Sequence, residues 1–152
     1  MGKPKITIIP YSSTYDTQTV EMWRESKENA IGQKEGHSFE DHVYFLNYLL
    51  PKEYTIELAL IDHHVVGMIA YNDHEISQLY IHLDYQGIGI GTALLARAKE
   101  QSSGKLTLYT FEVNKQAQAF YEKHGFQIIG RGHENEEGLP DLLYEWILDT
   151  SH

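Results

Sequence analysis

The sequence predicts an α/β (α+β) domain with a mixed, mostly antiparallel sheet of six or seven strands and about four helices. Three strand-like segments follow one another with turn-sized gaps, which is typical of antiparallel hairpins. The third segment leads through a glycine-rich turn into a helix-forming stretch. At 152 residues the chain is long enough to bury a core without disulfides, so we expect one domain, residues 1–152.

Seven segments have the apolar density and the bounding turn residues of strands. They are residues 5–9, 54–61, 65–71, 76–83, 106–110, 126–130 and 142–148. Pro10 ends the first strand, because proline cannot donate to a sheet ladder. Asp62, His63 and His64 form the turn between the second and the third. We interpret the two histidines as a solvated turn.

Four segments have the periodicity or composition of helices. They are residues 17–31, 38–50, 92–100 and 115–124. Asp16 is the expected N-cap of the first helix, and Gly32 is its stop. Ser38 and Asp41 form an approximate capping box for the second, and Asn114 caps the fourth.

The glycine-rich turn is the main candidate for a ligand site. Its residues are Gln86, Gly87, Ile88, Gly89, Ile90, Gly91 and Thr92. The glycines remove the Cβ atoms that would keep a ligand from the backbone, and free N–H groups at a helix start suit a pyrophosphate. No Lys-Ser or Lys-Thr follows Gly91, which excludes a P-loop, and the spacing G-x-G-x-G excludes a Rossmann loop. The pattern that fits is Q-x-x-G-x-G, although a tight turn without a ligand has the same glycine spacing.

The composition argues against several classes of protein. The net charge of −10 argues against general nucleic-acid binding. No apolar run approaches a membrane span, and the absence of cysteine excludes disulfides and thiolate metal sites. The nine histidines show no tight ligand spacing, so we predict no metal. We expect a cytoplasmic protein that binds neither nucleic acid nor membrane, as a monomer or homodimer.

The charges are unevenly distributed along the chain. Residues 97–131 contain six basic and three acidic side chains, whereas residues 132–152 contain six acidic ones and no Lys or Arg. The basic third begins just after the glycine turn, where an anionic ligand would lie. Ordinary variation of a solvated surface is the alternative explanation.

A second motif lies downstream, where N-x-x-A-x-x-F-Y-x-K-x-G-F runs from Asn114 to Phe126. Tyr121 either packs against Phe120 or holds its hydroxyl near a reacting centre as a proton donor. Together with the strand and Q-x-x-G-x-G turn upstream, this string is far more specific than either part. The chain resembles the GNAT superfamily of acetyl-CoA-dependent N-acetyltransferases, in element order over about residues 5–148, with its motifs in residues 75–126.

The resemblance implies that the fourth and fifth strands splay apart to admit the pantetheine arm of acetyl-CoA. Backbone groups of Leu79 and Ile81 would pair with the acetyl and pantetheine groups, and Asn114 would meet the pantetheine. The turn would wrap the pyrophosphate, and Tyr121 would face the sulfur. The implied cofactor-binding residues are Leu79, Tyr80, Ile81, Gln86, Gly87, Ile88, Gly89, Ile90, Gly91, Thr92, Asn114 and Tyr121.

Acyl transfer to an amine needs a neutral nitrogen, a stabilised oxyanion and a protonated leaving thiolate. Glu75 is a candidate general base, because its even spacing from Ile81 predicts that it shares the face of Leu79 and Ile81. His74 and a chain of water molecules are the alternatives. The Leu79 N–H is the candidate oxyanion donor, and Tyr121 is the candidate acid.

The predicted function is N-acetyl transfer from acetyl-CoA to a primary amine by direct attack in a ternary complex. Acidic residues in the segments expected to build the acceptor site favour a cationic acceptor, such as a polyamine, an aminoglycoside or a lysine-containing peptide. These residues are Glu35, Glu40, Asp41, Glu134, Glu136, Glu137 and Asp141. The alternatives are an acyl-CoA-binding or sensing module without turnover, and a protein-interaction domain.

Overall fold

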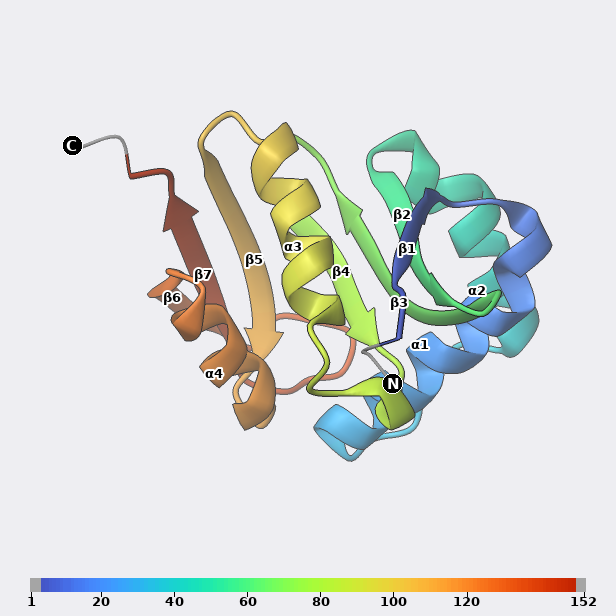
Figure 1. The fold of residues 1–152 in the computed structure, drawn as a ribbon. Coiled ribbons are helices and arrows are strands. Elements are labelled where there is room, and N and C mark those ends of the chain that lie inside the picture. The colour runs from blue at the N-terminus through green and yellow to red at the C-terminus, as the bar shows by residue number, and fades with distance from the viewer. Residues whose placement is uncertain (1–3, 150–152) are drawn as a thin grey trace.

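A computed structural model describes residues 4–149, so the predicted domain boundaries at 1 and 152 lie outside the described residues. Within this part the chain forms seven strands and four α-helices, which confirms the predicted fold class (Figure 1). The strands are β1 (Thr7–Pro10), β2 (Thr55–Ile61), β3 (His64–Tyr71), β4 (Ile76–Ile81), β5 (Lys105–Phe111), β6 (Gln127–Gly132) and β7 (Asp141–Ile147). The α-helices are α1 (Asp16–Ile31), α2 (Phe39–Tyr44), α3 (Ile90–Gln101) and α4 (Lys115–Lys123).

The strands form two antiparallel sheets, in the orders β1-β2-β3-β4 and β5-β7-β6. The sheets meet where β4 begins, through one parallel bridge between Glu75 and Thr107. There the Thr107 N–H donates to the carbonyl of His74 at 3.0 Å. No further pairing between β4 and β5 occurs within residues 4–149. Beyond the bridge, backbone groups on the facing edges of these strands are therefore not used by a shared ladder.

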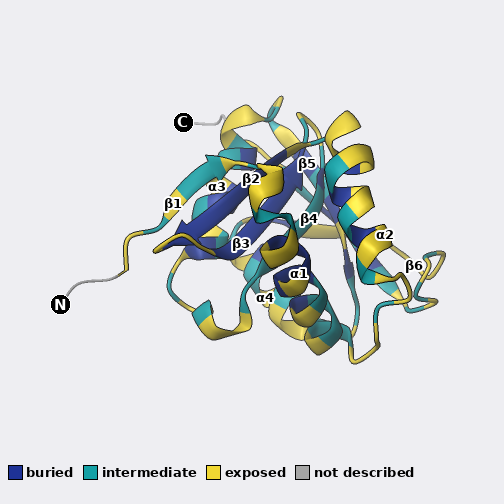
Figure 2. Ribbon diagram, turned by 90° about the vertical axis from the view of Figure 1, so that its right-hand side faces the viewer, coloured by how far each residue is buried: buried dark blue, intermediate teal, exposed yellow. Residues whose placement is uncertain are grey.

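The first sheet separates two hydrophobic cores, because alternate side chains of β2 point to opposite faces. Leu58 and Leu60 pack with α1 and the segment after α2, whereas Ala59 and Ile61 pack with α3, β5, β7 and α4. Figure 2 shows this arrangement, with buried residues concentrated in β2 and β3 and exposed residues on the outer turns of the helices. The glycine-rich turn therefore follows a strand of a sheet that is covered on both faces.

Helix capping follows the sequence in some places and differs in others. Ser38 Oγ accepts the Asp41 N–H at 3.1 Å, which confirms the predicted cap of α2. Asp16 was predicted as the N-cap of α1, but it is the first helical residue. A short 3-10 turn, Ser13–Tyr15, precedes it and places Tyr15 at the cap position. Asp16 instead lies in the first turn, where its charge still complements the helix dipole.

The predicted helix over residues 38–50 is not one regular α-helix. α2 ends at Tyr44, a π-helical turn covers Phe45–Leu49, and a 3-10 turn covers Leu50–Lys52. Its predicted apolar face is nevertheless buried, because Leu46 and Leu50 are 0% and 3% exposed. The apolar periodicity therefore identified the buried side correctly, while the backbone overwinds and unwinds locally to keep it facing the core.

The hairpin between β2 and β3 is tighter than predicted. Asp62 and His63 adopt positive φ angles of 48° and 65°, which suits a two-residue hairpin turn, and His64 already belongs to β3. Within residues 4–149 no helix has the length and apolar character needed to cross a membrane.

Candidate active site

The glycine turn opens directly into α3, which begins two residues earlier than the sequence suggested. Gly89 is the N-cap with φ +94°, a left-handed conformation that L side chains rarely adopt. A Cβ on Gly89 would have no neighbour within 4 Å, so this part of the turn is open. Gly91 lies inside the first turn of α3, where a Cβ would be 3.2 Å from two ring carbons of Phe120. The missing side chain at Gly89 thus leaves the backbone of the turn accessible to a ligand. At Gly91 it makes room for Phe120 of α4 beside α3.

A cavity of about 400 Å³ begins at this turn and extends along β4 to α4. Eleven of the twelve predicted cofactor-binding residues line it: Leu79, Tyr80, Ile81, Gln86, Gly87, Gly89, Ile90, Gly91, Thr92, Asn114 and Tyr121. The exception is Ile88, whose side chain packs against the core on the α3 side. The fold therefore brings the two sequence motifs together around one cavity.

Sequence reasoning missed several residues that also line this cavity. They are Ser26, Asn29 and Ala30 of α1, Leu83 and Tyr85 of the turn after β4, and Gln116, Ala117, Phe120, Lys123 and His124 of α4 and its C-cap. Helical periodicity could have identified two of them, since Ala117 lies four residues before Tyr121 and His124 three residues after it. No comparable local signal marks the residues of α1, which reach the cavity only through tertiary packing.

The charge of the larger cavity suits an anion. Its lining contains no Asp or Glu, although the chain carries a net charge of −10. Lys123 is exposed at its edge, and within the described chain no acidic side chain pairs with it. His124 Nε2 lies 3.2 Å from Thr92 Oγ1. Burial and the nearby Lys99 and Lys123 lower the pKa of His124, so its imidazole is neutral at neutral pH.

Side chains hold the end of β4 against the turn. The carbonyl oxygen of Ile81 accepts hydrogen bonds from Ser26 Oγ at 2.8 Å and from Gln86 Nε2 at 3.0 Å. A carbonyl oxygen has two lone pairs, so both are occupied. A pantetheine group that paired with this oxygen would have to displace Ser26 or Gln86 or share an acceptor site with one of them.

Tyr121 occupies the junction of two cavities. A smaller cavity of about 70 Å³, lined by α1, β4, β5 and α4, shares Leu79, Asn114 and Tyr121 with the larger one. Tyr121 is 7% exposed, and burial followed by the influence of Tyr80 raises the pKa of its hydroxyl. Within the described residues this hydroxyl makes no hydrogen bond. Tyr121 is therefore protonated at neutral pH and free to donate to a ligand.

Asn114 caps α4 as the sequence predicted, because its Oδ1 accepts the Ala117 N–H at 3.1 Å. It also lines both cavities. The cap and a ligand contact are compatible, since the amide nitrogen of the side chain is not used by the cap.

The predicted orientation of Glu75 is wrong because β4 contains a bulge. Tyr71 pairs with Ile76 and Ala70 with Gln78, so Ser77 is an extra residue in the ladder. The bulge reverses the alternation, and Ile76 packs in the same core as Leu79 and Ile81. Glu75 lines neither cavity.

The Glu75 carboxylate accepts a hydrogen bond from Tyr54 at 2.6 Å, and the Tyr54 ring packs against the α1-side core. His74, the alternative base, is exposed at the surface, with its Nδ1 2.8 Å from Asp73. The hydrogen bond to Asp73 is the main cause that raises the pKa of His74. Proton transfer from an amine in the cavities to either residue would therefore require an intervening water molecule or a rearrangement of the structure.

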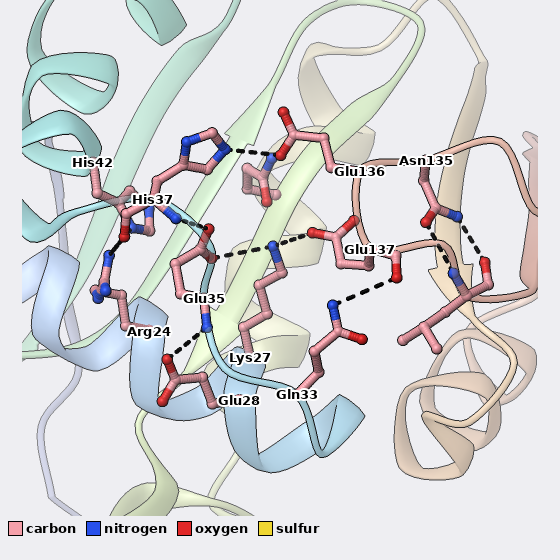
Figure 3. Close-up of polar contacts among 12 residues, drawn as sticks. Arg24, Lys27, Glu28, Gln33, Glu35, His37, His42, Asn135, Glu136 and Glu137 are labelled. Carbon is pink, nitrogen blue, oxygen red and sulfur yellow. Dashed lines mark hydrogen bonds and ion pairs between the residues drawn. The ribbon is translucent and has the colours of Figure 1, made fainter.

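Several acidic residues expected to face a cationic acceptor are paired within the protein (Figure 3). Glu35 and Glu137 both contact Lys27, and Glu136 contacts His37. The Asp141 carboxylate accepts a hydrogen bond from Asn135. The acidic surface at the acceptor side is therefore partly neutralised. Among residues 4–149, no group of three or more His, Asp and Glu side chains is placed to hold a metal ion.

Known proteins are similar to this chain in sequence and in fold. Residues 52–128 match the family model described as "Acetyltransferase (GNAT) domain". The peptidyl-lysine N-acetyltransferase YjaB of Salmonella typhimurium is 35% identical over 82 residues, which is 54% of this chain and 56% of the relative. The matched stretch thus spans about half the length of that relative.

Two solved structures share the fold at lower sequence identity. The solution structure of apo YjaB from Escherichia coli superposes with a TM-score of 0.77 at 23% identity, covering 95% of this chain and 99% of the other. The PaiA N-acetyltransferase of Thermoplasma acidophilum, crystallised with coenzyme A, gives a TM-score of 0.73 at 21% identity, over 94% and 99%. From the family model, which covers half of the sequence, we conclude that the chain belongs to the GNAT acetyltransferase family.

Proposed function

We propose that this protein transfers the acetyl group of acetyl-CoA to a primary amine, by direct attack within a ternary complex. The observation that carries the proposal is the cavity of about 400 Å³ beside the open glycine turn, with Lys123 at its edge and no carboxylate in its lining. Such a cavity favours a phosphate-bearing ligand, because turn N–H groups and a helix N-terminus attract an anion. The larger cavity would hold coenzyme A, with its thioester near Tyr121.

In the proposed reaction the neutral amine nitrogen attacks the carbonyl carbon of the thioester. The Leu79 N–H stabilises the oxyanion, the carbon–sulfur bond breaks, and Tyr121 donates its proton to the departing thiolate. The nitrogen loses a proton to water, which passes it to Glu75 or directly to bulk solvent; His74 remains the alternative. Because Glu75 lines neither cavity, its part in this step is indirect.

The acceptor that we propose is a lysine side chain of a peptide or protein. The name of the Salmonella typhimurium relative, a peptidyl-lysine N-acetyltransferase, supports this class over a polyamine or an aminoglycoside. The smaller cavity supports an extended, narrow substituent, because at about 70 Å³ it has room for a few atoms only. The net acidic surface favours a cation, although internal pairing weakens the field at this side.

The experiment that tests the function is an acetyl-CoA assay against lysine peptides, N-terminal peptides, polyamines, aminoglycosides and free amino acids. Coenzyme A binding is measured in parallel by calorimetry. Acetylation of a lysine peptide is the expected result. Coenzyme A binding without transfer to any amine would support a sensing module instead. A protein that binds no coenzyme A would contradict both.

A further inference from the structure

Two segments that are far apart in the sequence lie side by side next to the C-terminal part of α1 (Figure 3). One is residues 33–37, directly after α1. The other is residues 133–140, the acidic loop between β6 and β7, which we call the acidic loop. Lys27 and Glu137, which connect them, are 110 residues apart in sequence. The acidic loop has no regular secondary structure of its own. A backbone bond from the Glu112 N–H to the Pro140 carbonyl, 2.9 Å long, anchors one end, and side-chain contacts hold the middle of the loop.

The inner contact is a nearly buried cluster of one ammonium and two carboxylates. Lys27 Nζ lies 2.6 Å from Glu137 and 3.3 Å from Glu35. Their side chains are 16%, 15% and 5% exposed, in the order Lys27, Glu137, Glu35. Burial by itself lowers the pKa of Lys27, but its contacts with Glu137, Tyr80 and Glu35 outweigh burial and raise it. The ammonium stays charged, and little solvent screens its bonds.

The outer contacts are weaker. His37 Nε2 lies 2.9 Å from Glu136, but these side chains are 55% and 73% exposed. Exposed ion pairs contribute little, so this one adds little to the position of the loop. The Gln33 amide donates to the backbone carbonyl of Glu137 at 3.4 Å. Asn135 braces the loop internally, donating to the Leu139 carbonyl at 2.7 Å and accepting the Leu139 N–H at 3.2 Å. The inner cluster is therefore the main link between the loop and α1.

The same lysine belongs to the wall of the smaller cavity. Lys27, Ala30 and Ile31 of α1 line it, together with Leu79 and Tyr121. If coenzyme A fills the larger cavity, as we proposed above, the amine must approach its thioester from this side. The contact between Lys27 and Glu137 thus couples the acidic loop to the wall along which the acceptor would enter.

We propose that Lys27 is a positioning residue for the acceptor: through Glu137 it holds the acidic loop against α1 and so shapes the acceptor entrance. This inference rests on the proposed function. This positioning role differs from the electrostatic attraction that the acidic loop could exert on a cationic acceptor, because the Glu137 carboxylate already contacts Lys27. Loss of the contact makes the loop less ordered. The acceptor must then order the loop when it binds, and this loss of conformational entropy weakens binding.

The test variant is Glu137→Gln, which replaces the charged contact by at most a weaker hydrogen bond to an amide oxygen. It leaves Lys27 and Glu35 as a pair with no net charge. Glu25→Gln is the matched control, since it removes the same charge, and Glu25 is exposed on α1, lines neither cavity and has no partner among the described residues. A second variant, Lys27→Gln with Glu35→Gln, removes the ammonium without leaving the Glu35 carboxylate uncompensated. It should give the same result, and adding Glu137→Gln to it should have little further effect.

We measure amide hydrogen exchange of residues 133–140, the acceptor KM and the coenzyme A dissociation constant. We expect Glu137→Gln to speed exchange in the loop by about 10-fold and to raise the acceptor KM by about 5-fold or more. The coenzyme A dissociation constant should stay within about 2-fold, and Glu25→Gln should change none of the three. Unchanged exchange would overturn the positioning of the loop. Faster exchange with an unchanged KM would overturn its role in acceptor binding. If the wild type transferred no acetyl group the proposed function would fail, and the exchange comparison would still decide how the loop is held.

Discussion

Tyr121 combines two properties that a buried proton donor needs. Burial and Tyr80 raise the pKa of its hydroxyl, so the proton is present at neutral pH. Its ring is fixed by edge contacts with Phe120 and Phe126, at centroid distances of 5.3 and 5.5 Å. These contacts confirm the packing alternative read from the sequence, and Tyr121 also lines both cavities. Its role as a proton donor stays a prediction.

The substitution Tyr121→Phe should separate these two roles. It keeps the ring contacts, so the free energy of unfolding should change by less than about 1 kcal/mol. Without the hydroxyl, kcat should fall by about 100-fold or more, while the coenzyme A dissociation constant stays nearly unchanged. Steady-state kinetics and calorimetry measure these quantities. A variant with wild-type kcat would show that Tyr121 serves packing alone.

At the scale of elements, the glycine turn and α4 form one unit. The turn supplies open backbone at Gly89, and α4 supplies the opposite wall through Phe120 and Tyr121. Gly91 connects the two, because Phe120 lies where a larger residue would place its Cβ. Gly89 and Gly91 therefore serve different physical purposes, although they look equivalent in the sequence.

Substitutions at Gly89 and Gly91 should accordingly fail in different ways. Gly89→Val introduces a side chain at φ +94° and over the open turn, so coenzyme A affinity should fall by about 10-fold or more. Gly91→Val crowds Phe120, and overpacking of this kind costs about 1–3 kcal/mol of unfolding free energy. Adding Phe120→Leu should restore stability to the Gly91 variant but leave the Gly89 variant unchanged. Thermal unfolding and calorimetry test this, and rescue of both variants would contradict the distinction.

At the scale of the whole molecule, an ion pair between a buried carboxylate and a partly exposed guanidinium connects α3 to the centre of the first sheet. Glu57 of β2 is 5% exposed and contacts Arg97 of α3 at 2.8 Å and 3.2 Å. Its carboxylate also accepts the Tyr71 hydroxyl at 2.6 Å. Because α3 begins at the glycine turn, this contact helps to hold the candidate cofactor site on the sheet.

Arg97→Met should therefore destabilise the protein in a pH-dependent way. Burial by itself raises the pKa of Glu57, but the bonds from Arg97 and Tyr71 outweigh burial and hold it below its ordinary value of 4.5. Such a group contributes stability above its unfolded pKa, and that contribution disappears as the pH falls through the folded pKa.

We expect Arg97→Met to lower the free energy of unfolding at pH 7, because it leaves a buried carboxylate without its cation. The difference from the wild type should shrink below about pH 4.5. Urea unfolding at pH 7, 5 and 4 measures it. If the difference in unfolding free energy between the wild type and the variant stayed constant from pH 7 to 4, the charge of Glu57 would not be the cause of the destabilisation.

The sequence by itself determined the order of the elements, most of their bounds to within two residues, the Ser38 and Asn114 caps, and the two motifs that meet at the cavity. These features depend on interactions within a few residues. Examples are a hydroxyl that accepts a hydrogen bond from the amide three residues later, and a glycine that adopts the positive φ angle a turn requires. The family model matches residues 52–128, a range that contains both motifs.

Only the tertiary structure decided the direction of Glu75, because the bulge at Ser77 reverses the alternation that the sequence predicts for an ideal strand. It also decided that Ile88 packs into the core and that α1 lines the cavity. The pairing of Glu137 with Lys27 spans 110 residues, and no local pattern encodes it. In each case the physical reason is the same: burial and long-range contacts select among orientations that the local sequence leaves nearly equal in energy.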